Sequence, residues 1–266
     1  MPALSAICRS DKAKVLLGNL RLIFPILKDK GQYVSDVTEK LRLQFNDDLE
    51  TRVHAYGHKI LPAGLMDTCA SGVLVYVVSR YPAAVRWFRV GDRKYVVKGC
   101  LGAETSTYEA GGDLVETAPY GHVTASQMES VFPRFLGEFE QRRAPYDGAP
   151  PRHKNASPVV RPVVCHSISL TRFAPPDFVL DIHCGAGCNM RSLVQDIGKA
   201  LGSRAHVTSM ERHQHGPFTL EHALPSYKWS WEEAAAQSEA LQHLWYPYMK
   251  KVQQSEKHHE GQARYQ

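Results

Sequence analysis

The sequence predicts an α+β fold in which helices flank a mixed, largely antiparallel central sheet. Strand-like segments outnumber helical ones, and the two do not alternate in the rhythm that a parallel α/β sheet requires. There is no internal repeat along the 266 residues. Hydrophobic residues make up 43% of the chain and charged residues 22%, a composition typical of a globular protein with a buried core.

The predicted strands are short apolar runs rich in β-branched residues and bounded by turn residues. The clearest is 72–78 (GVLVYVV), whose unbroken apolar character is typical of a central strand. Pro25 cannot donate a backbone hydrogen bond, so it places the run 20–27 at a sheet edge or a bulge. The remaining predicted strands are 94–101, 163–173, 178–184 and 206–210.

The predicted helices combine an N-cap residue with apolar side chains at intervals of three and four. The segment 189–201 is the most clearly amphipathic, because Met190, Leu193 and Ile197 fall on one face. The others are 35–46 with Ser35 as N-cap, 124–136 with Thr124 as N-cap and a kink at Pro133, and a helix after Ser230 that leads into a polar tail. The segment 144–162 contains five prolines, which predicts a loop or linker.

The charge balance permits a nucleic-acid partner without requiring one, since the net charge is only +5. The N-terminal segment lacks the apolar run of a signal peptide, and no stretch approaches the ~20 apolar residues of a membrane span. We therefore expect an intracellular protein of the nucleus or cytoplasm, with the mitochondrion left open and with no membrane partner.

The cysteines do not form a recognisable metal site. Of the six, only Cys184 and Cys188 are close in sequence, and no second pair stands at the spacing of a zinc site. The others are Cys8, Cys69, Cys100 and Cys165. We expect six reduced thiols and no bound metal.

One local motif suggests a methyltransferase. Residues 179–187 (VLDIHCGAG) resemble motif I of the S-adenosylmethionine-dependent methyltransferases, in which a strand leads through a glycine-rich turn into a helix. Glu211, after the next predicted strand, would then bind the ribose hydroxyls. Against this alternative, less than a third of the chain follows Gly187, and the strand-rich region precedes the motif.

A second resemblance extends along most of the chain. The segment from Gly64 to Leu74 (GLMDTCASGVL) resembles the G-T-L-D-x-x-A-x-G-V-L motif of TruB-type tRNA pseudouridine synthases. Arg93-Lys94-Tyr95 resembles the K-R-Y segment that begins the next strand in that family. Later landmarks of the family follow in order at Leu101–Gly112, Phe135–Gln141, Arg161–Val163, Phe178–Leu201 and Met210–Leu220. The resemblance covers roughly residues 64–231, and it gives the methyltransferase-like turn a second interpretation.

The resemblance implies a pseudouridine synthase-like fold divided into three parts. These are a divergent N-terminal segment (1–50), a catalytic domain (51–231) and a helical, polar C-terminal tail (232–266), as in members of the family without a C-terminal RNA-binding module. It also implies an isomerase that converts uridine to pseudouridine in RNA. That reaction needs neither a cofactor nor a metal, because no redox step or phosphate transfer occurs.

The same resemblance assigns the site residues. Asp67 takes the place of the family's catalytic aspartate, Arg191 that of its partner cation, and Tyr95 that of the tyrosine that stacks on the flipped base. Met210 matches an apolar residue packed under this pocket, and Arg212 a neighbouring arginine.

The expected partner is tRNA, modified in its T-loop, or another structured RNA, with mRNA as a further candidate and DNA excluded. Lys94 and Arg212 would meet phosphates, and His58 would be the family's RNA-holding histidine, displaced by an insertion, because Pro62 occupies the usual position. The resemblance implies a monomer. A long basic arm of the family is mostly missing, which leaves open a weak or inactive RNA-binding homologue as a second hypothesis.

Overall fold

The computed structural model describes residues 21–80, 83–144 and 160–263, so most of the predicted linker at 144–162 lies outside the described residues. Contacts divide the chain into two compact units, each built from separate stretches of sequence. The first comprises Met1–Met66, Gly72–Gly91 and His215–Gln266, and the second comprises Asp67–Ser71 and Asp92–Gln214. The domain boundaries that the sequence places after residues 50 and 231 stay a prediction.

The first unit is built on three strands, β1 (Arg21–Lys28), β2 (Lys59–Pro62) and β3 (Ala70–Ser79). β3 pairs antiparallel with both β1 and β2, and nearly every one of its side chains is buried. This confirms the central strand predicted from its apolar run. β1 lies at the edge of the sheet, which is where Pro25 is tolerated.

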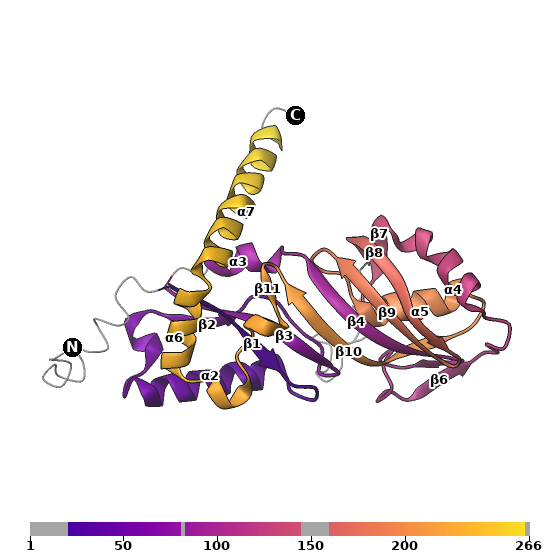
Figure 1. Cartoon of the computed structure of the whole chain (residues 1–266), viewed down its shortest axis with the longest axis horizontal. Coiled ribbons are helices and arrows are strands. Elements are labelled where there is room, and N and C mark those ends of the chain that lie inside the picture. Colours follow the sequence, from indigo (N-terminus) through magenta and orange to yellow (C-terminus); the bar gives the residue numbers. More distant parts are fainter. Residues whose placement is uncertain (1–20, 81–82, 145–159, 264–266) are drawn as a thin grey trace, which may run out of the picture. The chain divides into compact units, whose positions relative to one another are not determined.

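Helices cover both faces of these strands (Figure 1). On one face Phe24 packs against Phe45 of α2, and Phe45 meets the ring of Trp231 of α6 edge-on. On the other, the buried cluster around Val75 includes Phe88 and Trp245. The helices of this unit are α2 (Val34–Asp48), α3 (Ala83–Arg89), α6 (Trp231–Ala240) and α7 (Gln242–Ala263), with short 3-10 turns at Val53–Tyr56, Leu220–His222 and Ser226–Lys228. The short strand β11 (Phe218–Thr219) completes the unit.

The predicted helix caps are right at two positions and wrong at a third. Thr124 forms a reciprocal capping box with Gln127, and the Ser230 hydroxyl accepts a hydrogen bond from the Glu233 amide. Ser35 is not the N-cap of α2. The cap residue is Tyr33, no side chain closes that end, and the Ser35 hydroxyl donates to Asp36 instead.

The second unit contains a five-stranded sheet in the order β10-β4-β9-β8-β7. The pairings β4–β9, β9–β8 and β8–β7 are antiparallel. The strands are β4 (Arg93–Leu101), β7 (Gly137–Arg142), β8 (Val160–Ala174), β9 (Asp177–Cys184) and β10 (Ala205–His215). A separate hairpin joins β5 (Ala103–Thr105) to β6 (Leu114–Thr117).

The two faces of this sheet differ, because side chains along β4 and β9 alternate between buried and accessible positions. The inner face carries Tyr95 of β4 and Ile182 of β9, both buried, and α5 (Met190–Ala200) packs against β4. The outer face carries the side chains between them, including Lys94 and His183. Helix α4 (Ala125–Val131) packs against β8 and ends at a 3-10 turn (Phe132–Phe135), so Pro133 follows the helix and does not kink it.

The strand–turn–helix at 179–187 does not belong to a nucleotide-binding βαβ unit. β9 runs antiparallel to both of its neighbours, whereas a methyltransferase-type motif needs a parallel strand. Gly187 is required for a different reason, because its φ of 88° lies in the left-handed region where the turn enters α5. β10 also continues through Glu211 to His215. The methyltransferase alternative therefore has no support in the fold.

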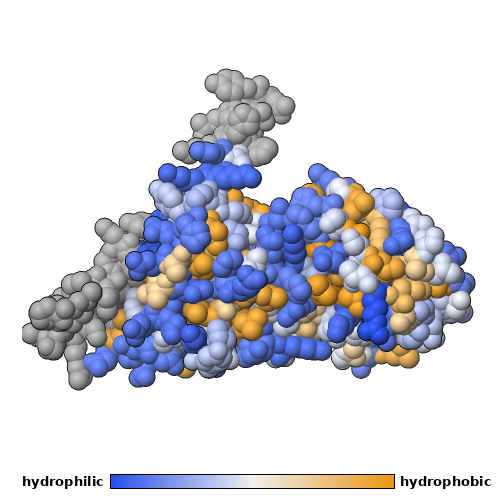
Figure 2. All heavy atoms as spheres, viewed as in Figure 1, coloured by the Kyte–Doolittle hydropathy of each residue, from blue (hydrophilic) through white to orange (hydrophobic). Residues whose placement is uncertain are grey.

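The described helices include none that is long and apolar enough to cross a membrane. Hydrophilic and hydrophobic side chains are interspersed over the visible face of the molecule (Figure 2).

Candidate active site

An ion pair between Asp67 and Arg191 is the centre of the candidate site. The Arg191 Nε donates to Asp67 Oδ2 at 2.9 Å, and its Nη2 donates to Asp67 Oδ1 at 3.2 Å. The contact is therefore bidentate, which fixes the orientation of the carboxylate as well as its distance. The Arg191 side chain is 2% exposed and that of Asp67 is 23% exposed, so the carboxylate can be reached from solvent while the guanidinium cannot.

The N-terminus of α5 holds Arg191 in place. Asn189 is the N-cap, and its side chain accepts a hydrogen bond from the Ser192 amide. Gln141 of β7, which is buried, clamps Asn189 from the other side. Its Nε2 donates to the Asn189 carbonyl at 3.0 Å, and its Oε1 accepts from the Asn189 amide at 2.8 Å. Arg191 thus lies in the first turn of a helix whose cap residue, Asn189, has both its backbone amide and its carbonyl held by Gln141.

The loop between β5 and β6 supplies a third contact to Arg191. The Thr107 carbonyl accepts a hydrogen bond from Arg191 Nη1 at 2.6 Å. The loop is anchored to β10, because the Val207 amide donates to the Tyr108 carbonyl and the Ala110 amide donates to the Val207 carbonyl. A carbonyl oxygen held in this way satisfies the part of the guanidinium that Asp67 does not reach.

Cys69 lies beside the ion pair but is a poor candidate nucleophile. Burial raises the pKa of the Cys69 thiol far above its usual range, and a hydrogen bond with Glu109 and the charge of Asp67 raise it further. A neutral thiol neither attacks a carbon centre nor competes with Asp67 for the cation. The Cys69 thiol is therefore the weaker candidate, and the role of Asp67 as the reacting group stays a prediction.

A second group of site residues lies on the inner face of the sheet. The Tyr95 hydroxyl accepts a long hydrogen bond of 3.4 Å from Arg212 Nη1. Tyr95 is 8% exposed, and Met210 and Arg212 of β10 are both buried. Met210 is thus a core residue of β10, and its role under the base pocket stays a prediction.

Two other residues are expected to bind RNA, and neither is placed beside these groups within its own unit. Lys94 follows the alternation of β4 and lies on the outer face, opposite His183 in the register and away from Tyr95. His58 belongs to the first unit, between a 3-10 turn and β2, and its side chain is 1% exposed. Their roles in RNA binding stay predictions.

Three features of the site were not singled out from the sequence. The Thr107 carbonyl and the Gln141 clamp lie in segments that match family landmarks, so the motif offered a signal for them. The hydrogen bond between Cys69 and Glu109 offered none, because it joins a residue beside β3 to the β5–β6 loop and depends on the folded register.

Chemically, the arrangement presents one oriented carboxylate, accessible to solvent and paired with a buried cation. Such a group can act as a nucleophile or as a base toward a substrate that fills the accessible side.

Comparison with known proteins identifies the relatives of this chain. Residues 52–190 match the family model of the TruB family pseudouridylate synthase N-terminal domain. The human pseudouridylate synthase TRUB1 is 36% identical over 239 residues, which cover 83% of this chain and 68% of the relative. The mouse protein of the same name is 36% identical over 184 residues, covering 65% of this chain and 54% of the relative. The chain thus spans between about half and two thirds of the length of these relatives.

Solved structures agree on the fold. A crystal structure of a Cbf5–Nop10–Gar1 complex matches with a TM-score of 0.59 at 20% identity, covering 84% of this chain and 56% of that one. An archaeal Nop10–Cbf5 complex matches with a TM-score of 0.57 at 19% identity, covering 87% and 58%. These matches confirm the predicted α+β fold of the pseudouridine synthase type with its largely antiparallel sheet. The family model matched over residues 52–190 and the 36% identity to the human relative show that the chain belongs to the TruB family of pseudouridylate synthases.

Proposed function

We propose that this chain isomerises uridine to pseudouridine in structured RNA, with Asp67 as the reacting carboxylate. The observation that carries the proposal is the bidentate Asp67–Arg191 pair, whose two members come from separate family motifs 124 residues apart. The chain spans 54% of the mouse relative and 68% of the human one, so the activity of those proteins is carried over to this chain as a proposal.

The reaction is an isomerisation in which atoms and electrons balance within the substrate. The bond between N1 of uracil and C1′ of ribose breaks, the base turns over, and a bond from C5 to C1′ replaces it. The proton that leaves C5 is balanced by the proton that N1 gains. Only one carboxylate beside the glycosidic bond is needed, as a nucleophile or as a base, and Asp67 supplies it.

The neighbouring residues prepare that carboxylate and the base. Arg191 is a positioning residue that favours the ionised form of Asp67 and holds its rotamer. Tyr95 offers a ring on which the flipped uracil stacks, and stacking supplies most of the contact area that a pyrimidine can make. Arg212 of β10 donates a hydrogen bond to the Tyr95 hydroxyl, and we propose that the buried Met210 of the same strand packs under the pocket.

We propose tRNA, through its T-loop, as the first substrate, and other structured RNA including mRNA as the second. Several bacterial relatives are named tRNA pseudouridine synthase B, among them a protein of Syntrophotalea carbinolica that is 29% identical over 177 residues. A loop presents bases that are already splayed outward, so flipping costs less there than in a duplex. A matching structure with a TM-score of 0.56 is of an H/ACA RNP bound to a substrate RNA. We further propose that the protein is intracellular, is a monomer and does not bind DNA.

The test uses the full chain with an unmodified tRNA and with a duplex of the same T-arm sequence. Wild type and Asp67→Asn are incubated with each RNA, binding is measured by filter retention, and pseudouridine is read by a chemical label specific for it. We expect product from wild type on the tRNA, none from Asp67→Asn, and similar binding by both proteins.

Two other results would overturn the proposal in different ways. Binding by wild type without product on any RNA would make the chain a non-catalytic RNA-binding homologue. Product from wild type and Asp67→Asn alike would mean that another group carries the reaction.

A further inference from the structure

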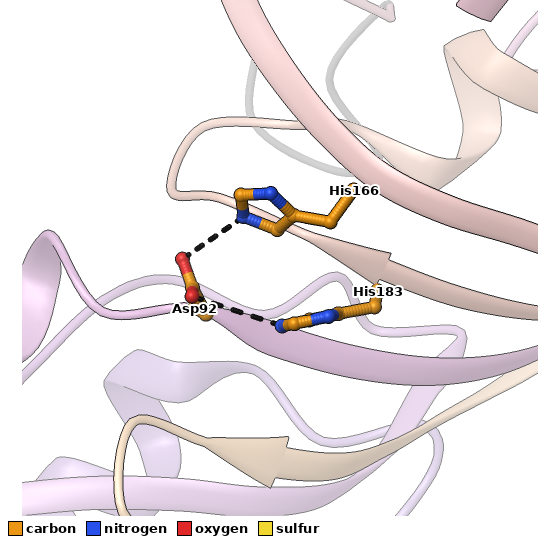
Figure 3. A group of neighbouring side chains, drawn as sticks. All are labelled: Asp92, His166 and His183. Atoms are coloured by element: carbon orange, nitrogen blue, oxygen red, sulfur yellow. Dashed lines mark hydrogen bonds and ion pairs between the residues drawn. The ribbon is translucent and has the colours of Figure 1, made fainter. Parts of the chain in front are cut away.

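Three side chains outside the candidate active site form a cluster with the geometry of a metal site. Asp92, His166 and His183 lie at the solvent side of the sheet in the second unit, and one ligand atom from each falls within 4.8 Å of the other two. Figure 3 shows both imidazole rings directed toward the Asp92 carboxylate. We propose that these residues bind a divalent transition-metal ion of the zinc type.

The long hydrogen bond between His166 and Asp92 and the longer contact between His183 and Asp92 leave room for one ion among the three side chains. His166 Nε2 lies 3.3 Å from Asp92 Oδ1, and His183 Nε2 lies 3.7 Å from Asp92 Oδ2. A charged hydrogen bond between these groups would be about 2.7–2.9 Å long. Ligand bonds of about 2.0–2.2 Å set neighbouring ligand atoms of a tetrahedral site roughly 3.3–3.6 Å apart, so the His166 distance fits and the His183 distance is slightly longer.

The local fold brings the two histidines together through a bulge. The register between β8 and β9 shifts between Cys165 and Ser167, which leaves His166 as the extra residue in β8. Bulges re-aim side chains in this way. The rings of His166 and His183 consequently approach to 4.7 Å between centroids, at the point where Asp92 precedes β4.

The donor set selects among metals. Two imidazoles and one carboxylate suit zinc, cobalt or nickel, whereas magnesium and calcium prefer oxygen ligands alone. All three side chains are between about a third and a half exposed, so a metal ion can enter and water can complete its coordination. Lys94 lies on the same face, opposite His183 in the register, and its charge opposes a bound cation. The Lys94 side chain is exposed, so solvent screens that repulsion.

The ion would tie together three segments that lead to the candidate active site. Asp92 stands three residues before Tyr95, and His183 precedes the turn that ends at the cap of α5 and Arg191. A bound ion would therefore fasten the start of β4, the bulge of β8 and the end of β9, and raise the stability of the fold. This inference does not rest on the proposed RNA chemistry.

The test is a zinc titration of the full chain, without an affinity tag, against a chromophoric chelator. We expect one Zn²⁺ per wild-type chain and a thermal unfolding midpoint that rises with zinc. His166→Ala, His183→Ala and Asp92→Asn should each weaken binding at least about tenfold. Mg²⁺ should produce no shift in the midpoint.

The matched control is His213→Ala. His213 is also an accessible histidine beside a carboxylate, Glu211, at 2.7 Å, but among the residues that the structure describes no third ligand joins that pair. His213→Ala should bind zinc as wild type does. Cobalt substitution separates the cluster from the buried thiols, because nitrogen and oxygen ligands give no thiolate charge-transfer band. Equal zinc binding by wild type and the three cluster variants, equal loss in His213→Ala, or a thiolate band would each overturn the proposal.

Discussion

The guanidinium of Arg191 joins three parts of the second unit through one side chain. It bonds to both oxygens of Asp67 and to the Thr107 carbonyl, and it is almost completely buried. A lysine keeps the charge at this position but cannot reproduce two parallel N–H donors. The geometry of Asp67 should therefore depend on arginine and not merely on a positive charge.

Arg191→Lys tests that dependence. We expect the turnover rate on tRNA to fall about 100-fold, because a small misplacement of the carboxylate is costly, while RNA binding stays within about twofold of wild type. Single-turnover kinetics at saturating enzyme separates the two effects. A large loss of binding with an unchanged rate would show that Arg191 holds RNA and not the carboxylate.

Tyr95 should act through its ring and not through its hydroxyl, because its hydrogen bond to Arg212 is long at 3.4 Å. Tyr95→Phe keeps the aromatic face, and we expect it to retain RNA binding. Tyr95→Ala removes the stacking platform, which is worth about 1–3 kcal/mol per base. Competition binding with the two variants checks this, and equal affinities for Tyr95→Ala and wild type would remove Tyr95 from the base pocket.

At the scale of elements, the start of α5 is where packing and function meet. The Asn189 cap, the Gln141 clamp and the turn at Gly187 together decide where Arg191 lies. Helix α5 therefore contributes to the site through its first turn, while its apolar face builds the core.

Gln141→Ala removes both hydrogen bonds to the Asn189 backbone in a buried place. We expect a loss of stability of about 1–3 kcal/mol and a lower turnover rate, because the start of α5 is freed. Chemical denaturation and single-turnover assays measure the two effects. Gln127→Ala is the control, since it weakens the capping box of α4 and should reduce stability without slowing turnover. Equal turnover by Gln141→Ala and wild type would contradict the positioning role.

Asp196 of α5 makes the stability of this helix depend on pH. Burial raises the pKa of the Asp196 carboxyl, opposed by the charge of Lys199. Since the folded-state pKa lies above the unfolded one, ionisation of Asp196 costs stability. That stability is fully present below the unfolded pKa of ~3.9 and is lost as pH rises through the folded pKa.

Asp196→Asn should therefore unfold at a higher temperature than wild type at pH 7, and the difference should vanish as pH approaches 4. Thermal unfolding at both pH values measures this. Asp113→Asn, at an exposed position, should leave the midpoint unchanged at either pH. A destabilised Asp196→Asn at pH 7 would mean that ionised Asp196 stabilises the fold.

The sequence was most informative where one local pattern decides the outcome. The unbroken apolar run of β3, the edge position implied by Pro25 and the caps at Thr124 and Ser230 all follow from nearest-neighbour chemistry. The sequence predicts Ser35 as the cap because a serine before an apolar repeat is a common cap, whereas the cap residue is Tyr33, two residues earlier. The cluster of Asp92, His166 and His183 was invisible because it requires strand register and a bulge.

At the scale of the whole molecule, a resemblance spread along most of the chain outweighed the stronger local match at 179–187. A glycine-rich turn between a strand and a helix suits both folds, so these residues alone do not distinguish them. The antiparallel pairing of β9 with both of its neighbours does distinguish them. Family landmarks in the correct order predict the pairing of Asp67 with Arg191, and the structure places the two side chains in contact. The family landmark marks the segment that contains Thr107, but the residue type does not reveal which carbonyl meets Arg191, because every residue presents one.

The chain spans between 54% and 68% of its mouse and human relatives, so activity must be tested on this chain itself. The deciding measurement is the single-turnover rate of pseudouridine formation on unmodified tRNA by wild type, Asp67→Asn, Arg191→Lys and the double variant. If Arg191 acts through Asp67, the double variant should be no slower than Asp67→Asn alone, which itself should give only background. Product from Asp67→Asn at a rate near that of wild type would contradict the assignment of Asp67 as the reacting group.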